Sequence, residues 1–206
     1  TGNGGTNVLA GLAGADQING LGGIDTADYS ASAGRINVNL ATGVTLGGDG
    51  HGDTLISIEN LIGTNSALSD FLTGNAGANR IEGGAGDDEI NGGLGNDTLL
   101  GGLGADKFIF NTALGPTNVD TILDFTANTD LFHLENNIFV GLSEGVLAVS
   151  AFVIGAAATD ALQRIIYNNT TGDLLFDNDG NGADAAVTFA NVGTGLSLDN
   201  ADFMVV

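Results

Sequence analysis

The strongest constraint on this chain is a nine-residue repeat that runs in register from residue 74 to residue 109. Four copies follow one another: GNAGANRIE, GGAGDDEIN, GGLGNDTLL and GGLGADKFI. Asn79, Asp88, Asp97 and Asp106 occupy position six, and Ile81, Ile90, Leu99 and Phe108 occupy position eight. A glycine-rich linker would need neither column. The repeat therefore predicts a stack of similar structural units.

The three residues after position six predict a short β-strand. Alternation along a strand places position eight inward and positions seven and nine outward. Arg80 and Glu82 fit that outward placement. One unit cannot bury its single apolar side chain, so neighbouring units must stack to form a core. The sequence thus predicts an all-β fold, a parallel β-roll of the β-helix or solenoid type, with a C-terminal β cap.

The glycines and the Asp column together predict a metal site. Glycine allows turns with φ > 0 that bring backbone carbonyls close together, and a short Asp adds a charged oxygen. Ca²⁺ takes roughly 6–8 oxygen ligands, many of them carbonyls. Formal net charge is −21, with four basic residues and no cysteine. Such a polyanion is not expected to bind nucleic acid or anionic lipid, and several Ca²⁺ ions are the expected cofactors.

Four segments are expected along the chain. Residues 1–28 repeat the period loosely, with Asn7, Asp16 and Asp25 at position six but without the second glycine, so weaker metal occupancy is expected there. Residues 29–62 break the period as an insertion. Residues 63–133 form the main β-roll, in which Asp70, Asp120 and Asp130 begin further half-repeats. Residues 134–206 are expected to form the β cap, with strands near 162–168, 174–177 and 186–190 and a hairpin turn at 169–172.

These motifs resemble the RTX (repeats-in-toxin) family of Gram-negative bacteria. GGAGDDEINGGLGNDTLLGGLGADKFIF is similar to its nonapeptide array, and DTLISIENLIG to a segment that often precedes such arrays. VDTILDF followed by TDLFHL resembles the join to the family's secretion region, and Asp202–Val206 its C-terminus. The resemblance implies Ca²⁺ in both rows of turns, each ion shared by turns two repeats apart. It also implies export through a type I secretion apparatus as an unfolded chain.

The resemblance also implies the metal ligands: carbonyls at positions two and four with the side chain at position six, and Ser57 and Glu59 serving a turn near Asp25. Carried onto this sequence, the set is Asn7, Asp16, Gly23, Asp25, Ser57, Glu59, Asp70, Asn75, Gly77, Asn79, Gly84, Gly86, Asp88, Gly93, Gly95, Asp97, Gly102, Gly104, Asp106, Asp120 and Asp130. Because the first complete copy has a neutral Asn at position six, a weaker site is expected at Asn79.

Three functions are compatible with the sequence. The first is a secreted, extracellular Ca²⁺-binding module that folds after export and has no chemistry of its own. The second is the C-terminal part of an exported enzyme, such as a serralysin-like protease, a lipase or an alginate epimerase. The third is an adhesin or polysaccharide-binding module, which two Tyr, ten Phe and no Trp supply poorly. The chain opens in mid-repeat without a visible signal peptide, which suggests that a catalytic or adhesive domain precedes it.

Some features stay open or point away from catalysis. Asp177–Gly182 reads D-x-D-x-N-G, the first half of an EF-hand loop, but Thr188 stands where the bidentate Glu is expected. A Ca²⁺ site and a polar hairpin turn are equally compatible with it. His51 and His133 are the only histidines and no catalytic motif surrounds them. The apolar run 145–158 is too short for a membrane span of about 20 residues. Asp202–Val206 is expected to direct export rather than build the core, with an edge strand of the cap as the alternative.

Overall fold

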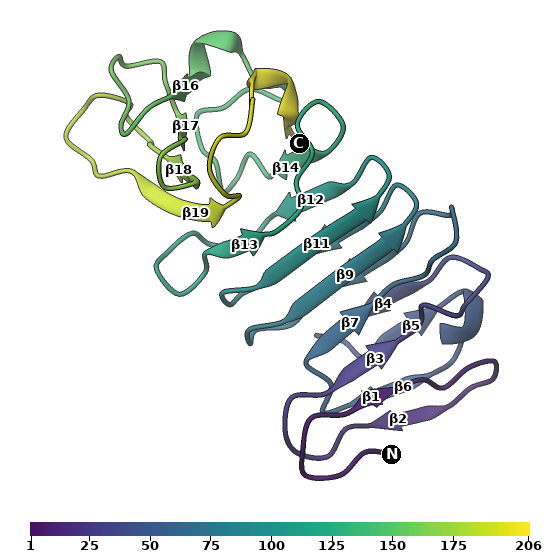
Figure 1. The fold of residues 1–206 in the computed structure, drawn as a ribbon. Coiled ribbons are helices and arrows are strands. Elements are labelled where there is room, and N and C mark those ends of the chain that lie inside the picture. The colour runs from purple at the N-terminus through teal and green to yellow at the C-terminus, as the bar shows by residue number, and fades with distance from the viewer.

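The nine-residue period builds a roll in which every coil takes two units. A computed structural model describes residues 1–206. Paired residues in neighbouring repeat strands lie 18 positions apart, as Glu89 does from Lys107 and Thr98 from Arg80. Successive strands therefore alternate between two sheets that face each other (Figure 1). The fold is all-β, a parallel β-roll as predicted, and its only helices are three short 3₁₀ turns.

The strands form two large sheets and one small one. The ten-stranded sheet has the order β1 (Val8–Leu9), β3 (Thr26–Asp28), β7 (Asn60–Ile62), β9 (Arg80–Ala85), β11 (Thr98–Leu103), β13 (Asp120–Ile122), β19 (Val187–Asn191), β18 (Asp173–Phe176), β17 (Ile165–Asn168), β16 (Phe152–Ile154). The eight-stranded sheet has the order β15 (Gly145–Val146), β20 (Phe203–Val205), β14 (Leu131–Leu134), β12 (Lys107–Phe110), β10 (Glu89–Asn91), β8 (Phe71–Thr73), β4 (Asn37–Asn39), β5 (Val44–Leu46). The small sheet pairs β2 (Gln17–Asn19) with β6 (Thr54–Ile56), and the 3₁₀ turns are η1 (Gly48–Gly50), η2 (Val149–Ala151) and η3 (Asn200–Asp202).

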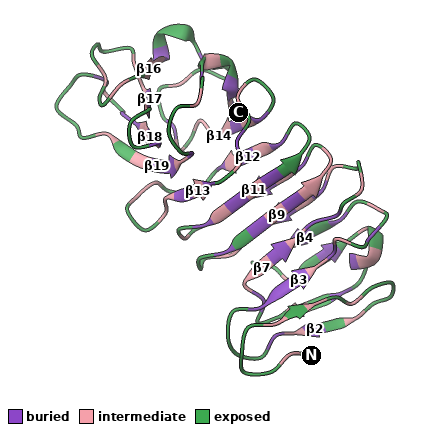
Figure 2. Cartoon of the chain, in the orientation of Figure 1, coloured by how far each residue is buried: buried purple, intermediate pink, exposed green.

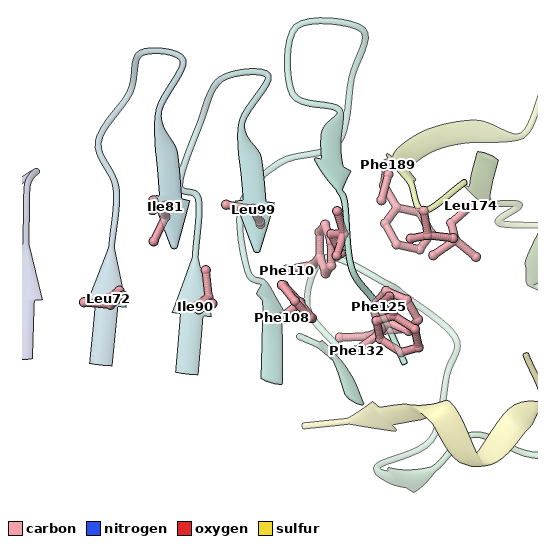
Figure 3. Close-up of a cluster of buried hydrophobic side chains, with 14 of the residues drawn as sticks. Leu72, Ile81, Ile90, Leu99, Phe108, Phe110, Phe125, Phe132, Leu174 and Phe189 are labelled. Carbon is pink, nitrogen blue, oxygen red and sulfur yellow. The ribbon is translucent and has the colours of Figure 1, made fainter. Parts of the chain in front are cut away.

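Position eight of each repeat builds the core between the two large sheets. Ile81 and Leu99 come from one sheet and Leu72 and Ile90 from the other, and all four are at most 1% exposed (Figure 3). The flanking strand positions are only half-buried or exposed (Figure 2). Each coil thus adds two apolar side chains to one continuous column, which is why no coil is stable alone.

Aromatic rings replace the aliphatic column towards the C-terminal end. Phe125 stacks on Phe132 with ring centroids 4.1 Å apart, and Phe132 stacks on Phe203 at 4.8 Å. Phe110 meets Phe189 of the cap edge-to-face at 5.1 Å. Since such pairs add roughly 0.5–1.5 kcal/mol beyond area burial, this aromatic cluster binds the roll to the cap (Figure 3).

The cap prolongs both large sheets. β19 pairs in parallel with β13, and β18 and β17 then follow by antiparallel pairing. Thr171 and Gly172 lie in the hairpin turn between β17 and β18. β17, β18 and β19 occupy the three segments for which the sequence predicted strands. Towards the N-terminus, β4 and β5 form an antiparallel hairpin within residues 29–62. Beyond this hairpin the roll ends in β1, β2 and β3 of the N-terminal repeats (Figure 1).

The last residues do not lie outside the core, contrary to the expectation from sequence. β20 pairs with β14 on one side and with β15 on the other, so it is an interior strand and neither an edge strand nor a free tail. Phe203 is fully buried and Val205 is 1% exposed. The physical reason is the alternation of Phe203 and Val205, which directs both side chains into the aromatic end of the core.

Candidate metal centres

The turns between the two large sheets form two rows, one along each side of the roll. Row 1 leads from the ten-stranded to the eight-stranded sheet and includes turns 63–70, 83–88, 101–106 and 123–130. Row 2 leads back and includes turns 74–79, 92–97 and 111–120; turn 20–25 continues this row from the small sheet to the ten-stranded sheet. Position six ends each turn, immediately before a strand begins. The parallel register therefore stacks the position-six side chains of one row directly above one another.

One oxygen of each stacked carboxylate holds the neighbouring coil. Asp88 Oδ1 accepts the Asp70 N–H at 2.8 Å, and Asp106 Oδ1 accepts the Asp88 N–H at 2.9 Å. In row 2, Asp97 Oδ1 accepts the Asn79 N–H at 2.8 Å. We call the full set the carboxylate ladder; its donor–acceptor pairs are Asn7–Asp25, Asp16–Asp53, Asp25–Glu59, Ile36–Asp70, Asp70–Asp88, Asn79–Asp97, Asp88–Asp106, Asp97–Asp120, Asp106–Asp130 and Asn128–Asp202.

The second oxygen has no partner in the most regular turns. Oδ2 of Asp25, Asp88 and Asp97 is shielded from solvent and accepts no hydrogen bond. The molecule's two ion pairs, Arg80–Glu82 and Lys107–Glu89, lie elsewhere on partly exposed side chains. A buried carboxylate without a counter-charge is costly. These three oxygens therefore mark places where a cation fits.

The first glycine of each repeat leaves the room that this oxygen occupies. A Cβ added to Gly92 would lie 2.2 Å from Asp97 Oδ2, and one added to Gly101 would lie 2.2 Å from Asp106 Oδ2. The turns also stack at a distance only glycine permits. Gly102 has φ +100°, and a Cβ there would lie 2.1 Å from the carbonyl oxygen of Gly84 in the turn below. Backbone carbonyls are thus crowded beside each Asp carboxylate.

Burial raises the pKa of these carboxyl groups well above the usual Asp range. In the metal-free protein, burial raises the pKa of Asp88 to about 7, and the charges of Asp70 and Asp106 add to the effect. Burial likewise raises the pKa of Asp97 and of Asp106 to about 6. Asp120 reaches a pKa of about 7 through burial and the charge of Asp97. Without a cation, these sites hold their negative charge poorly at neutral pH.

The donor set suits Ca²⁺. Nowhere does the structure gather three or more His, Asp or Glu side chains into a cluster that could hold a metal ion. A cation in these turns would therefore take most of its ligands from backbone carbonyls, together with one carboxylate from a turn. Oxygen-only sites built largely from carbonyls are typical of Ca²⁺, and sites for softer metals use nitrogen and sulfur.

The turns that depart from the repeat close with their own hydrogen bonds. Asn79 Nδ2 donates to the Glu59 carbonyl at 2.6 Å, and Asn79 Oδ1 accepts the Asn75 N–H at 2.8 Å. In the longer turns, Asp70 Oδ2 accepts the Thr64 N–H at 2.6 Å and Asp130 Oδ2 accepts the Thr126 N–H at 2.7 Å. These side chains need no ion to satisfy their oxygens.

The N-terminal repeats are not uniformly degenerate. Asp25 is fully buried with a free Oδ2, and Glu59 Oε2 accepts its N–H at 2.8 Å. The carbonyl of Ser57 faces the same turn, since a Cβ on Gly20 would lie 2.2 Å from it. Ser57 and Glu59 thus lie beside the turn of Asp25, and their role as metal ligands stays a prediction. Asp16, by contrast, is only half-buried.

The sequence missed three carboxylates that belong with these turns. Asp53 accepts the Asp16 N–H, and its half-repeat DTLI was the available signal. Asp124 accepts the N–H groups of both Gly101 and Gly102 at 3.0 Å, so it closes the top of the last regular turn of row 1. Asp202 is 1% exposed, and its Oδ1 accepts the Asn128 N–H at 2.6 Å. No repeat period marks Asp202.

Stacked two-strand coils with an acidic column in each row of turns define the class of Ca²⁺-binding parallel β-rolls. The family model described as "RTX calcium-binding nonapeptide repeat" matches in four copies, over residues 1–29 and 67–108. These two segments therefore carry RTX nonapeptide repeats, a kind of repeat that binds several Ca²⁺ ions and is typical of secreted proteins. No curated protein matches the chain. None of its helices has the length and apolarity that crossing a membrane requires.

Proposed function

We propose that this chain is a Ca²⁺-driven folding module of an exported protein, and that it carries out no chemistry itself. The observation that supports this most directly is the unpartnered, buried Oδ2 of Asp25, Asp88 and Asp97. These atoms give the folded chain a place for cations that the unfolded chain lacks. Ions that bind only the folded state stabilise it by RT ln(1 + [L]/Kd) at each site.

The ligand set we propose ranks the turns by these open oxygens. The leading sites use Gly84, Gly86 and Asp88, the corresponding residues ending in Asp97, and the turn of Gly23 and Asp25 with Ser57 and Glu59. The turn of Gly102, Gly104 and Asp106 comes next. Asp120 extends row 2 towards the cap. Asp130 extends row 1 but ranks lower, because its Oδ2 already accepts the Thr126 N–H. The turn of Asn75, Gly77 and Asn79 ranks lowest, because its side chains are already hydrogen bonded.

The timing of folding follows from charge and affinity. The formal net charge of −21 and the buried carboxylates oppose the metal-free fold. Extracellular Ca²⁺ modules bind with Kd values of about 10⁻⁴–10⁻³ M, so their sites stay empty in the cytosol and fill outside the cell. We propose that the chain crosses a type I secretion apparatus unfolded and folds on meeting Ca²⁺. Since β20 is built into the core, any export signal in Asp202–Val206 would be read before folding.

We propose that the chain has no catalytic activity of its own, because neither histidine has a partner for acid–base catalysis. His51 is exposed, and neither it nor His133 forms a hydrogen bond or an ion pair with a carboxylate. Burial and the nearby charge of Lys107 lower the pKa of His133. A neutral, unpaired imidazole on the outer face of β14 suits packing better than acid–base catalysis.

Circular dichroism of the full chain with and without EDTA tests the proposal. We expect a largely disordered spectrum in EDTA and a β spectrum in millimolar Ca²⁺, with reversal on chelation. Mg²⁺ at the same concentration is the control, because it accepts carbonyl-rich, flexible sites poorly. A β spectrum that EDTA leaves unchanged would rule out Ca²⁺-driven folding.

A further inference from the structure

The turn that joins β18 to β19 in the cap contains a second kind of oxygen-lined loop. It spans residues 177–186 and lies outside both segments that match the nonapeptide family. Its first six residues read DNDGNG. The carboxylates in this loop are arranged differently from those of the roll, because no ladder bond joins them to another coil.

Two of the three aspartates of this loop, the buried Asp177 and the half-buried Asp179, lack a counter-charge. Asp177 is 5% exposed, and its Oδ1 accepts only the N–H of Asp179, at 3.2 Å. Asp179 Oδ2 accepts the N–H groups of Ala183 and Asp184, at 2.8 and 3.2 Å. Asp179 Oδ1 is shielded from solvent and has no partner. Neither residue belongs to an ion pair.

A third oxygen comes from Asn181, which a neighbouring loop holds in place. Its N–H donates to the Asp160 carbonyl at 3.1 Å, and Nδ2 donates to the Thr159 carbonyl at 3.2 Å. Asn181 Oδ1 itself accepts no hydrogen bond, so this oxygen is free to act as a ligand. Gly182 makes the tight approach possible, since a Cβ there would lie 1.9 Å from Asp179 Oδ2.

We propose that Asp177, Asp179 and Asn181 bind one Ca²⁺ ion, at a site separate from the nonapeptide sites. Oxygen ligands at alternate positions of a short acidic loop, followed by glycine, are the arrangement that hard divalent cations accept. Because Thr188 replaces the bidentate Glu of a complete loop, the expected Kd is about 10⁻⁴–10⁻³ M. The ion would join loop 158–163 to the β18–β19 turn at the outer end of the cap.

Counting bound ions tests this site in the folded, full-length chain. Equilibrium dialysis at saturating Ca²⁺ is expected to show one ion fewer for Asp179→Asn than for the unchanged chain. Asp184→Asn is the matched control, because Asp184 is exposed, belongs to the same loop and makes no side-chain hydrogen bond; it should bind the full number. Equal counts for Asp179→Asn and the unchanged chain would overturn the proposal.

A second variant keeps the test decisive if Asp179→Asn folds poorly. Asn181→Asp adds a third carboxylate to the proposed ligand set, and we expect it to tighten the weakest binding step by about tenfold, since ligand charge sets the affinity of such loops. Protection of residues 177–186 from hydrogen exchange should then saturate at lower Ca²⁺. No change in that protection would count against the site. Neither an unchanged ion count nor unchanged protection would alter the Ca²⁺-induced β spectrum of the roll. The loop site can therefore be disproved while the proposed function still holds.

Discussion

At the scale of the residue, the carboxylate at position six has two separate tasks. Oδ1 of Asp97 fixes the adjacent coil through the Asn79 N–H, and Oδ2 stays free for a cation. Asn can accept a hydrogen bond as Asp does, but its Nδ2 becomes a donor, as the bond from Asn79 to the Glu59 carbonyl shows. Asn in place of Asp at position six therefore affects metal binding more than it affects the stacking of coils.

The first glycine of the repeat should be as important for metal binding as the Asp. A methyl group on Gly92 would lie 2.2 Å from Asp97 Oδ2 and force that oxygen to move. We expect Gly92→Ala to raise the Ca²⁺ midpoint of folding by about tenfold, equivalent to about 1.4 kcal/mol. Gly115→Ala is the control, because a Cβ there meets nothing within 4 Å. Circular dichroism during a Ca²⁺ titration measures both midpoints. Equal midpoints for the two variants would show that the room left by Gly92 is not needed for Asp97 Oδ2 to bind Ca²⁺.

Ca²⁺ affinity should increase with pH. The metal-free fold raises the pKa of Asp88 from 3.8 to about 7 and that of Asp97 to about 6. Because the folded pKa is the higher one, the stability these groups give the metal-free fold is fully present below about pH 4 and is lost as pH rises towards 7. The chain without Ca²⁺ is disordered, so its Asp groups keep the ordinary pKa of about 3.9, and folding by Ca²⁺ displaces only the protons bound near that pH. We therefore expect the Ca²⁺ midpoint of folding to fall as pH rises from about 3.5 to 5, by up to about tenfold per pH unit for each proton released, and to stay nearly constant above about pH 5.

Calorimetry in buffers of different ionisation enthalpy measures that proton release. At about pH 4, Asp88→Asn should release fewer protons than the unchanged chain, because its position 88 carries no titrating carboxyl group. The same measurement above pH 8 provides the control, since all of these carboxyl groups are then ionised. Proton release at pH 6 would contradict this expectation and show that the chelated chain keeps these carboxyl groups buried, with the raised pKa values of the fold.

At the scale of the element, the strands differ in how well the sequence specifies them. The strands from β8 to β12 follow the nine-residue period, so position eight predicted their inward residues correctly. The hairpin of β4 and β5 has no period, and its pairing depends on Val38 and Thr45 meeting across a turn that many sequences could make. The register of β20 beside β14 was not predictable for the same reason: no local signal links residues 71 positions apart.

The two arrays of repeats should respond differently to loss of their Asp. Asp97 is 1% exposed with a free oxygen, and it lies between coils on both sides. Asp16 is half-buried, and its small sheet has only two strands. Loss of a hydrogen bond that involves a charged group costs about 1.5–3 kcal/mol. We therefore expect Asp97→Ala to raise the Ca²⁺ midpoint by about 10–100-fold and Asp16→Ala by less than about threefold.

Both variants can be compared by titrating Ca²⁺ and recording the β signal. Asp87→Ala provides a control within a complete repeat, because Asp87 is exposed but its Oδ1 accepts the Ala105 N–H at 2.9 Å. The Ca²⁺ midpoint of Asp87→Ala should lie between those of Asp16→Ala and Asp97→Ala. Equal shifts for Asp97→Ala and Asp16→Ala would show that the N-terminal repeats bind metal as strongly as the central ones.

At the scale of the whole molecule, the cap is part of the roll's core. The sequence indicated that something must end the array, and it predicted the cap strands, but it did not show that the last residues are core residues. The aromatic cluster explains the difference. Phe203 reaches Phe132 only because β20 returns to pair beside β14, and long-range pairing of this kind leaves no trace in a local pattern.

The last strand should therefore matter for stability. Phe203 is fully buried, and replacing it with Ala should cost about 3–5 kcal/mol, as in other cores. Met204, its neighbour on the opposite face of β20, is only partly buried, and Met204→Ala should cost less than about 1.5 kcal/mol. Urea unfolding in saturating Ca²⁺ measures both. If an export signal is read before folding, secretion of the two variants in a type I-competent host should be equal, and a selective defect for Phe203→Ala would indicate that the ring itself is recognised.

The carboxylate ladder gives the roll a direction. In every one of its bonds, the acid comes later in the sequence than the N–H that it accepts. A roll that assembles from the cap towards β1 always finds the next acid already in place, whereas one that assembles from β1 leaves each coil incomplete until the next arrives.

The two ends of the roll also differ in how well they would tolerate duplicated repeats. An extra pair of repeats inserted beside β1 would alter no existing ladder bond, while one inserted beside β14 would separate Asp202 from Asn128. Such an array can lengthen at only one end.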